Sequence, residues 1–198
     1  MLELNRSAQK QERFYNGVFA LILINLILFV LDQALPLQFL YLNHARPAWY
    51  QFFTSIFLHA NWAHLSGNLF FLYIFGKLVE EEEGILGVVA SYIITGLGAN
   101  LLSVLLQPGA TLSLGASGAV FGLFVVSVLI KLRWSWRKIL EVLILGQFVI
   151  QQVISELQQV GLQDGVNRIA HIGGALAGVA LIMGLRRLTS NKKLDSEV

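Results

Sequence analysis

Residues 115–138, GASGAVFGLFVVSVLIKLRWSWRK, decide the fold of this chain. The part from Gly115 to Ile130 carries no charged side chain, and a cluster of basic residues then ends the apolar run. An uncharged run that stops at lysine and arginine is typical of a membrane-spanning helix whose inner end faces the cytoplasm. The fold therefore depends on how often this pattern recurs along the chain.

The pattern recurs over most of the 198 residues. Hydrophobic residues make up 56% of the sequence and charged residues 13%, half of the roughly 25% that is usual in soluble domains. Six apolar stretches are separated by turn residues or charges, at 14–31, 64–79, 85–106, 115 or 117 to 132, 139–154 and 169–185. We therefore predict an all-α membrane protein, a bundle of six transmembrane helices.

The domain plan follows from the same stretches: a tail at 1–13, one membrane domain at 14–185 and a second tail at 186–198. The first tail is unlike a cleavable signal peptide, so we expect the first stretch to remain as an anchor. The absence of cysteine excludes a disulfide framework and a cysteine nucleophile. A net charge of +2 is too small to suggest a nucleic-acid partner.

Lysine and arginine orient the chain, because positively charged loops tend to stay in the cytoplasm. All of the 14 basic residues except Arg46 and Arg168 fall on one side, so both ends are predicted to be cytoplasmic. The acidic run 80–83 is expected to be a solvated loop on that side, although Glu80 could accept hydrogen bonds at the inner end of the second stretch. The second, fourth and sixth stretches then begin near the outer face. Because they are only about 24 to 26 Å long, we expect a recess there that water enters.

Ser117 and His171, at the outer ends of the fourth and sixth stretches, are the candidate catalytic pair. Ser117 begins a helix, where small neighbours admit a substrate backbone and free N–H groups favour an oxyanion. His171 shares a helical face with Gly174 and Gly178, which would let the two helices pack closely. A neutral imidazole can accept the serine proton and return it to a leaving amine. The alternatives are a helix-packing serine motif and an interfacial histidine bonded to a loop.

His64 and Asn68 lie one helical turn apart at the start of the second stretch and present two donors that could stabilise an oxyanion. They could instead cap this helix and hold the aromatic segment 37–63 that precedes it. We expect Phe121 to stack on the imidazole, unless it faces lipid, and His59 to organise the preceding loop.

No acidic residue is placed to complete a catalytic triad, so a Ser–His dyad is favoured. Asp164 lies in a glycine-containing loop before the sixth stretch, and nothing in the spacing directs it at the histidine. The outer side offers only Asp32, Glu156 and Asp164 as carboxylates, which supports a metal site poorly. Neither a metal nor another cofactor is predicted.

These residues resemble the motifs of the rhomboid family of intramembrane serine proteases. The matching elements, within about 49–185, are His59-x4-His64-x3-Asn68, Gly76-x3-Glu80, Gly115-Ala116-Ser117-Gly118 with Phe121, and Ala170-His171-x2-Gly174-x3-Gly178. The resemblance implies a six-helix bundle with Ser117 as nucleophile and His171 as general base. It also implies an oxyanion hole formed by His64, Asn68 and the serine backbone N–H. One departure is Tyr50-Gln51, where many members carry Trp-Arg; it concerns the loop contacts of that arginine and not the dyad.

The expected activity is cleavage of single-span membrane proteins near the outer face of the bilayer. Because an intact helix hides its carbonyl groups, the substrate should carry helix-weakening Gly, Pro or polar residues at the cut. The rival interpretations are a rhomboid-like protein that binds membrane helices without cutting them, and a small transporter whose histidines relay protons. The membrane is expected to be a bacterial plasma membrane rather than an organellar one.

Overall fold

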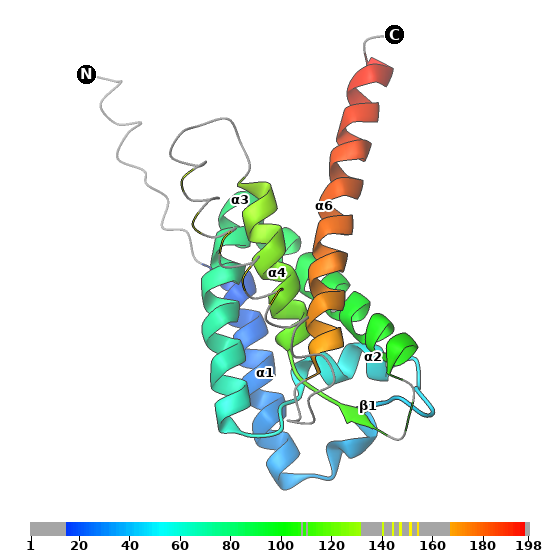
Figure 1. The fold of residues 1–198 in the computed structure, drawn as a ribbon. Helices are drawn as coiled ribbons and strands as arrows, with labels where there is room; N and C mark the ends of the chain where they lie inside the picture. The colour runs from blue at the N-terminus through cyan, green and yellow to red at the C-terminus, as the bar shows by residue number, and fades with distance from the viewer. Residues whose placement is uncertain are drawn as a thin grey trace, which may run out of the picture.

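The computed structural model describes residues 15–107, 109, 111–131, 140, 144, 147, 151, 154 and 167–196. The predicted tail 1–13 and, apart from five single positions, the fifth predicted stretch 139–154 lie outside the described residues. The described elements follow in the order α1 (Asn16–Ala34), η1 (Leu37–Leu40), β1 (Leu42–Asn43), α2 (Gln51–Thr54), η2 (Ser55–Phe57), α3 (Trp62–Leu106), β2 (Leu112–Ser113), α4 (Ser117–Ile130) and α6 (Arg168–Ser196) (Figure 1).

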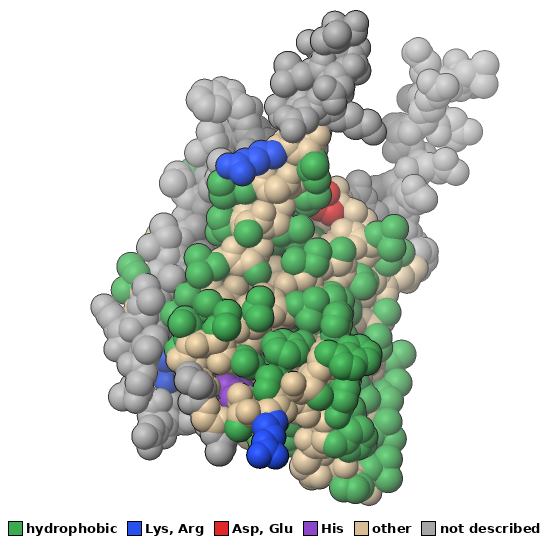
Figure 2. Space-filling view, turned by 90° about the vertical axis from the view of Figure 1, so that its right-hand side faces the viewer, with side chains coloured by type: hydrophobic (Ala, Val, Ile, Leu, Met, Phe, Trp, Pro, Cys, Tyr) green, Lys and Arg blue, Asp and Glu red, His purple; other side chains and the backbone are tan. Residues whose placement is uncertain are grey.

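Apolar helices of membrane-spanning length dominate the described part of the chain. Three qualify by length and composition: α1, α3 and the segment Arg168–Leu188 of α6. Helix α4 has 14 residues, about 21 Å, and is shorter than the roughly 30 Å hydrocarbon core of a bilayer. Hydrophobic side chains spread over the face seen in Figure 2, with few charged groups among them. The chain is thus a helical membrane protein, as predicted, while the six spans and the cytoplasmic ends stay predictions.

The second and third predicted stretches both lie in α3, which consists of two helices joined by a kink at Gly84. The acidic run 80–83 between them is helical, so the prediction of a loop was wrong, whereas the alternative that Glu80 accepts hydrogen bonds is confirmed. The helix bends at Gly84, whose φ of 74° and ψ of −176° lie in a region that only glycine adopts readily, and its two arms run in different directions (Figure 1). Within the run Glu80 is buried and Glu83 is exposed. The Glu80 carboxylate accepts the backbone N–H groups of Gly17 at 2.9 Å and Val18 at 2.8 Å. These are two of the donors that the start of α1 leaves without intrahelical partners.

Helix α4 is the centre of the bundle. Ten of its 14 residues are buried, and both α3 and α6 pack on it, while α1 packs on α3. Glycines allow the closest approach: a Cβ at Gly174 of α6 would collide with the Gly118 carbonyl oxygen. A Cβ at Gly178 would lie 2.9 Å from the Gly122 carbonyl oxygen. The fourth and sixth predicted stretches therefore lie backbone against backbone.

The aromatic segment before α3 folds into the short elements η1, β1, α2 and η2. Strand β1 pairs antiparallel with β2, so that Leu42 lies opposite Ser113 and Asn43 opposite Leu112. The prediction of an all-α chain overlooked this sheet, because strands of two residues show no periodicity in a sequence. The pairing connects the segment before α3 to the loop that leads into α4.

Gln51 holds the segment before α3 together, at the position where the resemblance drawn from the sequence would place an arginine. Its buried side chain donates from Nε2 to the Phe39 carbonyl oxygen at 2.9 Å. Its Oε1 accepts the backbone N–H groups of Asn43 at 3.2 Å and of Ala48 at 3.1 Å. A neutral amide thus makes the loop contacts here, and two of them require an acceptor that arginine does not have.

Candidate active site

Ser117 is held at the first turn of α4 by the segment that precedes α3. The Gly115 N–H donates to the Ser55 carbonyl oxygen at 2.9 Å, and the Ala116 N–H donates to Nε2 of His59 at 3.4 Å. Gly115 has a φ of 134°, a conformation that favours glycine. The turn that presents Ser117, residues 115–117, is therefore fixed by two hydrogen bonds on the residues directly before the serine.

His171 meets Ser117 across the contact between α4 and α6. Its Nε2 lies 2.8 Å from the serine Oγ, and the residue is 8% exposed. When Nε2 carries no proton it accepts the hydroxyl proton, the arrangement that general-base chemistry requires. Phe121, one turn after the serine, stacks on the imidazole with ring centroids 4.6 Å apart and an interplanar angle of 6°. The structure thus brings these three sequence-predicted residues together.

His64 and Asn68 lie on the first two turns of α3. The side chain of Asn61 caps this helix by accepting the His64 N–H at 2.9 Å. Nδ2 of Asn68 donates to the His64 carbonyl oxygen at 3.0 Å, which uses one of the two N–H groups of the amide. The His64 ring lies so close to Gly115 that a Cβ there would be 2.8 Å from Nε2. His64 is therefore next to the turn 115–117, and Asn68 lies one helical turn further along.

His59 is a buried, neutral acceptor beside the same turn. Burial, with a smaller contribution from neighbouring His64, lowers the pKa of His59 from 6.5 to about 3. Because Nε2 accepts the Ala116 N–H, the proton of the neutral ring lies on Nδ1. The rings of His59 and His64 meet edge to face with centroids 5.1 Å apart. His59 thus supports the turn 115–117 without carrying charge.

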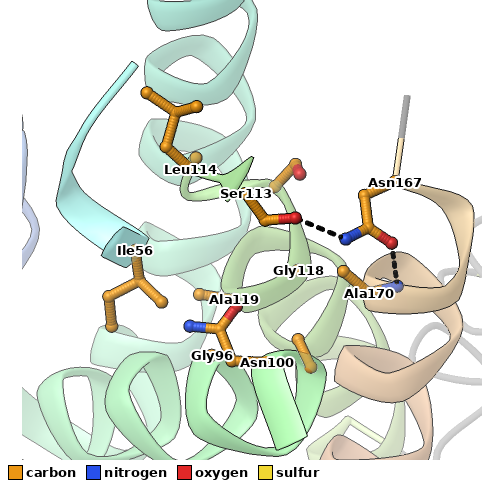
Figure 3. A pocket seen from close by; sticks show the side chains of 12 residues that line it. Ile56, Gly96, Asn100, Ser113, Leu114, Gly118, Ala119, Asn167 and Ala170 are labelled. Carbon is orange, nitrogen blue, oxygen red and sulfur yellow. Dashed lines mark hydrogen bonds between the residues drawn. The ribbon is translucent and has the colours of Figure 1, made fainter. Parts of the chain in front are cut away.

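Ser117 lines a small cavity of about 20 Å³. This is room for about one water molecule, which needs roughly 10 to 15 Å³. Figure 3 shows this cavity with Gly118, Ser113 and Asn167 around it. Small residues of α3, α4 and α6 form part of its wall, and Asn100, Ser113 and Asn167 add polar groups. A polar recess of this size next to a serine suits a reaction that consumes water.

Several polar groups that hold the site were missed by the sequence reasoning. Asn100, inside the third apolar stretch, donates from Nδ2 to the Phe52 carbonyl oxygen at 2.8 Å and to Ser55 Oγ at 2.9 Å. Asn167 caps α6, since its Oδ1 accepts the Ala170 N–H at 3.0 Å. A polar residue inside an apolar stretch and an asparagine just before one are both readable signals. The backbone carbonyl of Ser55 leaves no such signal.

In the part of the chain that the structure describes, no three His, Cys, Asp or Glu side chains are placed to hold a metal ion. Asp32 accepts the Tyr41 hydroxyl at 2.6 Å. Burial, and then this carboxylate, raise the pKa of Tyr41 to about 12. Glu156 and Asp164, the other two carboxylates predicted on the outer side, lie outside the described residues.

The fold and the site define a class: a bundle of membrane helices in which a serine and a histidine meet at the starts of two neighbouring helices. The profile of the Rhomboid domain matches residues 46–188. The chain therefore belongs to the rhomboid family, which confirms the resemblance drawn from its motifs.

Among its relatives, Rhomboid-like protein 11, chloroplastic, of Arabidopsis thaliana is 54% identical over 207 aligned positions, 98% of this chain and 72% of the relative. Rhomboid protease AarA of Providencia stuartii is 30% identical over 67% of this chain and 54% of its own length. Rhomboid-like protease 3 of Toxoplasma gondii is 36% identical over 65% of this chain and 49% of its own length. The chain thus spans about half of the latter two proteins, and less than half of several other Arabidopsis relatives. The family includes proteins named as proteases.

Proposed function

We propose that this chain is an intramembrane serine endopeptidase that cleaves transmembrane segments of membrane proteins near their outer ends. The observation that carries the proposal is the 2.8 Å contact between Ser117 Oγ and His171 Nε2. Membership of a family with members named as proteases supports the same activity. Both residues belong to a bundle of apolar helices, so the reaction would take place at membrane depth.

Ser117 is the nucleophile in this proposal and His171 the general base. The imidazole takes the hydroxyl proton as Oγ attacks the substrate carbonyl carbon, and gives it to the leaving amine when the C–N bond breaks. A water molecule, deprotonated by the same imidazole, then attacks the acyl-enzyme and releases the serine. Phe121, stacked on the imidazole, limits the rotation of the ring and keeps Nε2 on the serine.

The proposed oxyanion donors are the side chains of His64 and Asn68 and the backbone N–H of Ser117. Ser117 is the first residue of α4, so its N–H has no intrahelical acceptor and lies at the positive end of the helix dipole. Donors held in place before the reaction act most strongly where charge develops. Gly115 supports them, because the missing side chain leaves the space that the His64 ring occupies.

The proposed substrates are transmembrane segments that unwind easily. An intact helix uses its own N–H groups to cover its carbonyls, so a segment with Gly, Pro or polar residues near its outer end would expose the bond to be cut. Water would reach the acyl-enzyme through the polar cavity beside Ser117. The partners in this account are the lipid bilayer and such substrates, and the chemistry uses no cofactor.

For the location we propose an organellar membrane, in the first place one of the chloroplast. The 54% identity extends over 98% of this chain and connects it to a protein named as chloroplastic. This comparison argues against the preference for a bacterial plasma membrane that the sequence alone suggested. Fractionation of the source cells with an antibody against this chain tests the location, and recovery in the plasma membrane would contradict it.

A serine-directed fluorophosphonate tests the proposed chemistry. The detergent-purified protein should be labelled at Ser117, identified by mass spectrometry, and Ser117→Ala and His171→Ala should abolish the reaction. Ser127→Ala is the control, because this buried serine on the same helix bonds to the Phe124 carbonyl oxygen at 2.7 Å, away from the dyad. A folded wild-type protein that does not react, or that reacts at another serine, would contradict the proposal.

A further inference from the structure

A chain of hydrogen bonds crosses the outer end of the bundle and connects the loops that carry the two dyad residues. Its members are His44, Ser103, Gln107, Ser113 and Asn167. We propose that Asn167 is a positioning residue of the reaction, which holds His171 in register with Ser117 through its bond to Ser113. This inference rests on the proposed function, since it concerns the same dyad.

Asn167 is bonded to three separate elements. Its Oδ1 caps α6 by accepting the Ala170 N–H at 3.0 Å, and its backbone oxygen accepts the His171 N–H at 3.3 Å. Its Nδ2 donates to Ser103 Oγ of α3 at 2.6 Å and to Ser113 Oγ of β2 at 3.1 Å. Figure 3 shows the bonds to Ser113 and to Ala170 on opposite sides of the amide. One side chain thus joins the start of α6 to the end of α3 and to the strand before the serine.

The donor and acceptor capacity of each group indicates the direction of the hydrogen bonds in this network. The Gln107 carbonyl oxygen only accepts, so His44 Nδ1, 2.9 Å away, carries the proton. Its Nε2 lies 2.8 Å from Ser113 Oγ and accepts from this hydroxyl whenever it carries no proton. That leaves the lone pairs of Ser113 for the Asn167 amide. Donors and acceptors alternate without conflict, and a polar network satisfied in this way is rigid.

The dyad depends on this network from both sides. His171 lies in the first turn of α6, where the backbone is least constrained by its own helix, and Asn167 caps that turn. Ser113 lies four residues before Ser117, in the strand that pairs with β1. The close contact of Gly118 with Gly174 sets the distance between α4 and α6 further along the helices. The bond from Asn167 to Ser113 is a direct connection between the two loops at the level of the dyad.

Two single substitutions break this connection in different ways. Asn167→Ser keeps a good N-cap acceptor but is too short to hold both serines, and Ser113→Ala removes the acceptor on the other side. We expect each to lower kcat, and the rate of fluorophosphonate labelling, about tenfold or more, because a misplacement of about 1 Å in a catalytic group costs about 10²-fold. KM should change by no more than about twofold. Ser113→Thr, which keeps the hydroxyl that accepts from the Asn167 amide, should restore most of the rate.

The double variant separates positioning from general damage. If both substitutions act by breaking the same bond, Asn167→Ser with Ser113→Ala should react no more slowly than the slower single variant. Tyr41→Phe is the control, since it removes a hydrogen bond to Asp32 from the same outer segment without touching the network, and should react like wild type. Thermal midpoints are measured for all variants. If Asn167→Ser does not fold, Ser113→Ala and Ser113→Thr still test the bond from the side of a loop.

Three results would overturn the positioning role. The single variants could react at the wild-type rate, or their effects on the rate could multiply in the double variant. The reaction rates of the variants could also fall only as far as their thermal midpoints fall. A folded wild-type protein that neither cleaves nor reacts with the probe would instead reject the proposed function itself. The two failures are therefore distinguishable in one set of measurements.

Discussion

The imidazole of His64 occupies the space that a side chain at position 115 would need. A Cβ on Gly115 would lie 2.6 Å from Cε1 and 2.8 Å from Nε2 of His64, and the φ of 134° at Gly115 is itself unfavourable for other residues. The glycine therefore does more than allow a turn before the serine. It lets a proposed oxyanion donor lie against that turn.

The first prediction follows from this contact. Gly115→Ala should push the His64 ring away and lower kcat about 10²-fold, the size of effect seen when one oxyanion donor is lost. The measurement is cleavage of a labelled transmembrane substrate in detergent. Gly67→Ala is the matched control, because Gly67 lies on the same helix as His64 and a Cβ there would meet nothing within 4 Å. Wild-type turnover in Gly115→Ala would exclude His64 from the oxyanion hole.

The second prediction concerns the contact of α4 with α6. Gly174→Ala should lower the free energy of unfolding by about 1 to 3 kcal/mol or more, because its Cβ would collide with a backbone oxygen that cannot yield like a side chain. Gly178→Ala, with a 2.9 Å approach, should cost less. Gly184→Ala on the same helix should cost nothing, because the space there is open. Thermal unfolding in detergent measures the order, and an equal effect of all three would refute backbone contact between the two helices.

A third prediction is that acid destabilises the protein partly through His59. The folded-state pKa of about 3 lies below the ordinary value of 6.5, so between these values the unfolded chain binds more protons than the folded one. The contribution of neutral His59 to the free energy of unfolding is therefore fully present above pH 6.5. It decreases as the pH is lowered, by up to about 1.4 kcal/mol for each pH unit. His59→Gln keeps an acceptor for the Ala116 N–H but does not titrate. Its thermal midpoint should fall less steeply than that of wild type between pH 6.5 and 4, and parallel curves would speak against a buried neutral His59.

The fourth prediction concerns Glu80, which caps α1 from the side of α3. Glu80→Gln should lower the free energy of unfolding by about 1 to 3 kcal/mol, because one of the two backbone donors at Gly17 and Val18 would then face an N–H group. The exposed Glu83, also in the acidic run, provides the control: Glu83→Gln should leave the thermal midpoint unchanged. A similar loss in both variants would indicate that net charge, and not the cap, is what stabilises the fold.

Much of this structure could be predicted because the type of a side chain indicates whether it lies in lipid, in the protein interior or in water. The apolar stretches reveal membrane helices, and Ser117 and His171 are conspicuous at the ends of such stretches. The contacts made by backbone could not be predicted in this way, as the Ser55 carbonyl that holds Gly115 illustrates. The acidic run was predicted to be a loop because charged residues are usually solvated. Glu80 was recognised as a possible hydrogen-bond acceptor, but its partners are backbone N–H groups of α1, which no side-chain pattern reveals. Strands β1 and β2 are too short for any periodicity to show.

The most direct test of the central claim is cleavage by the wild-type protein and by Ser117→Ala, purified in detergent and given the same labelled transmembrane substrate. The account predicts products with wild type and none with Ser117→Ala, while both show the same thermal midpoint. Equal cleavage by the two proteins would contradict it.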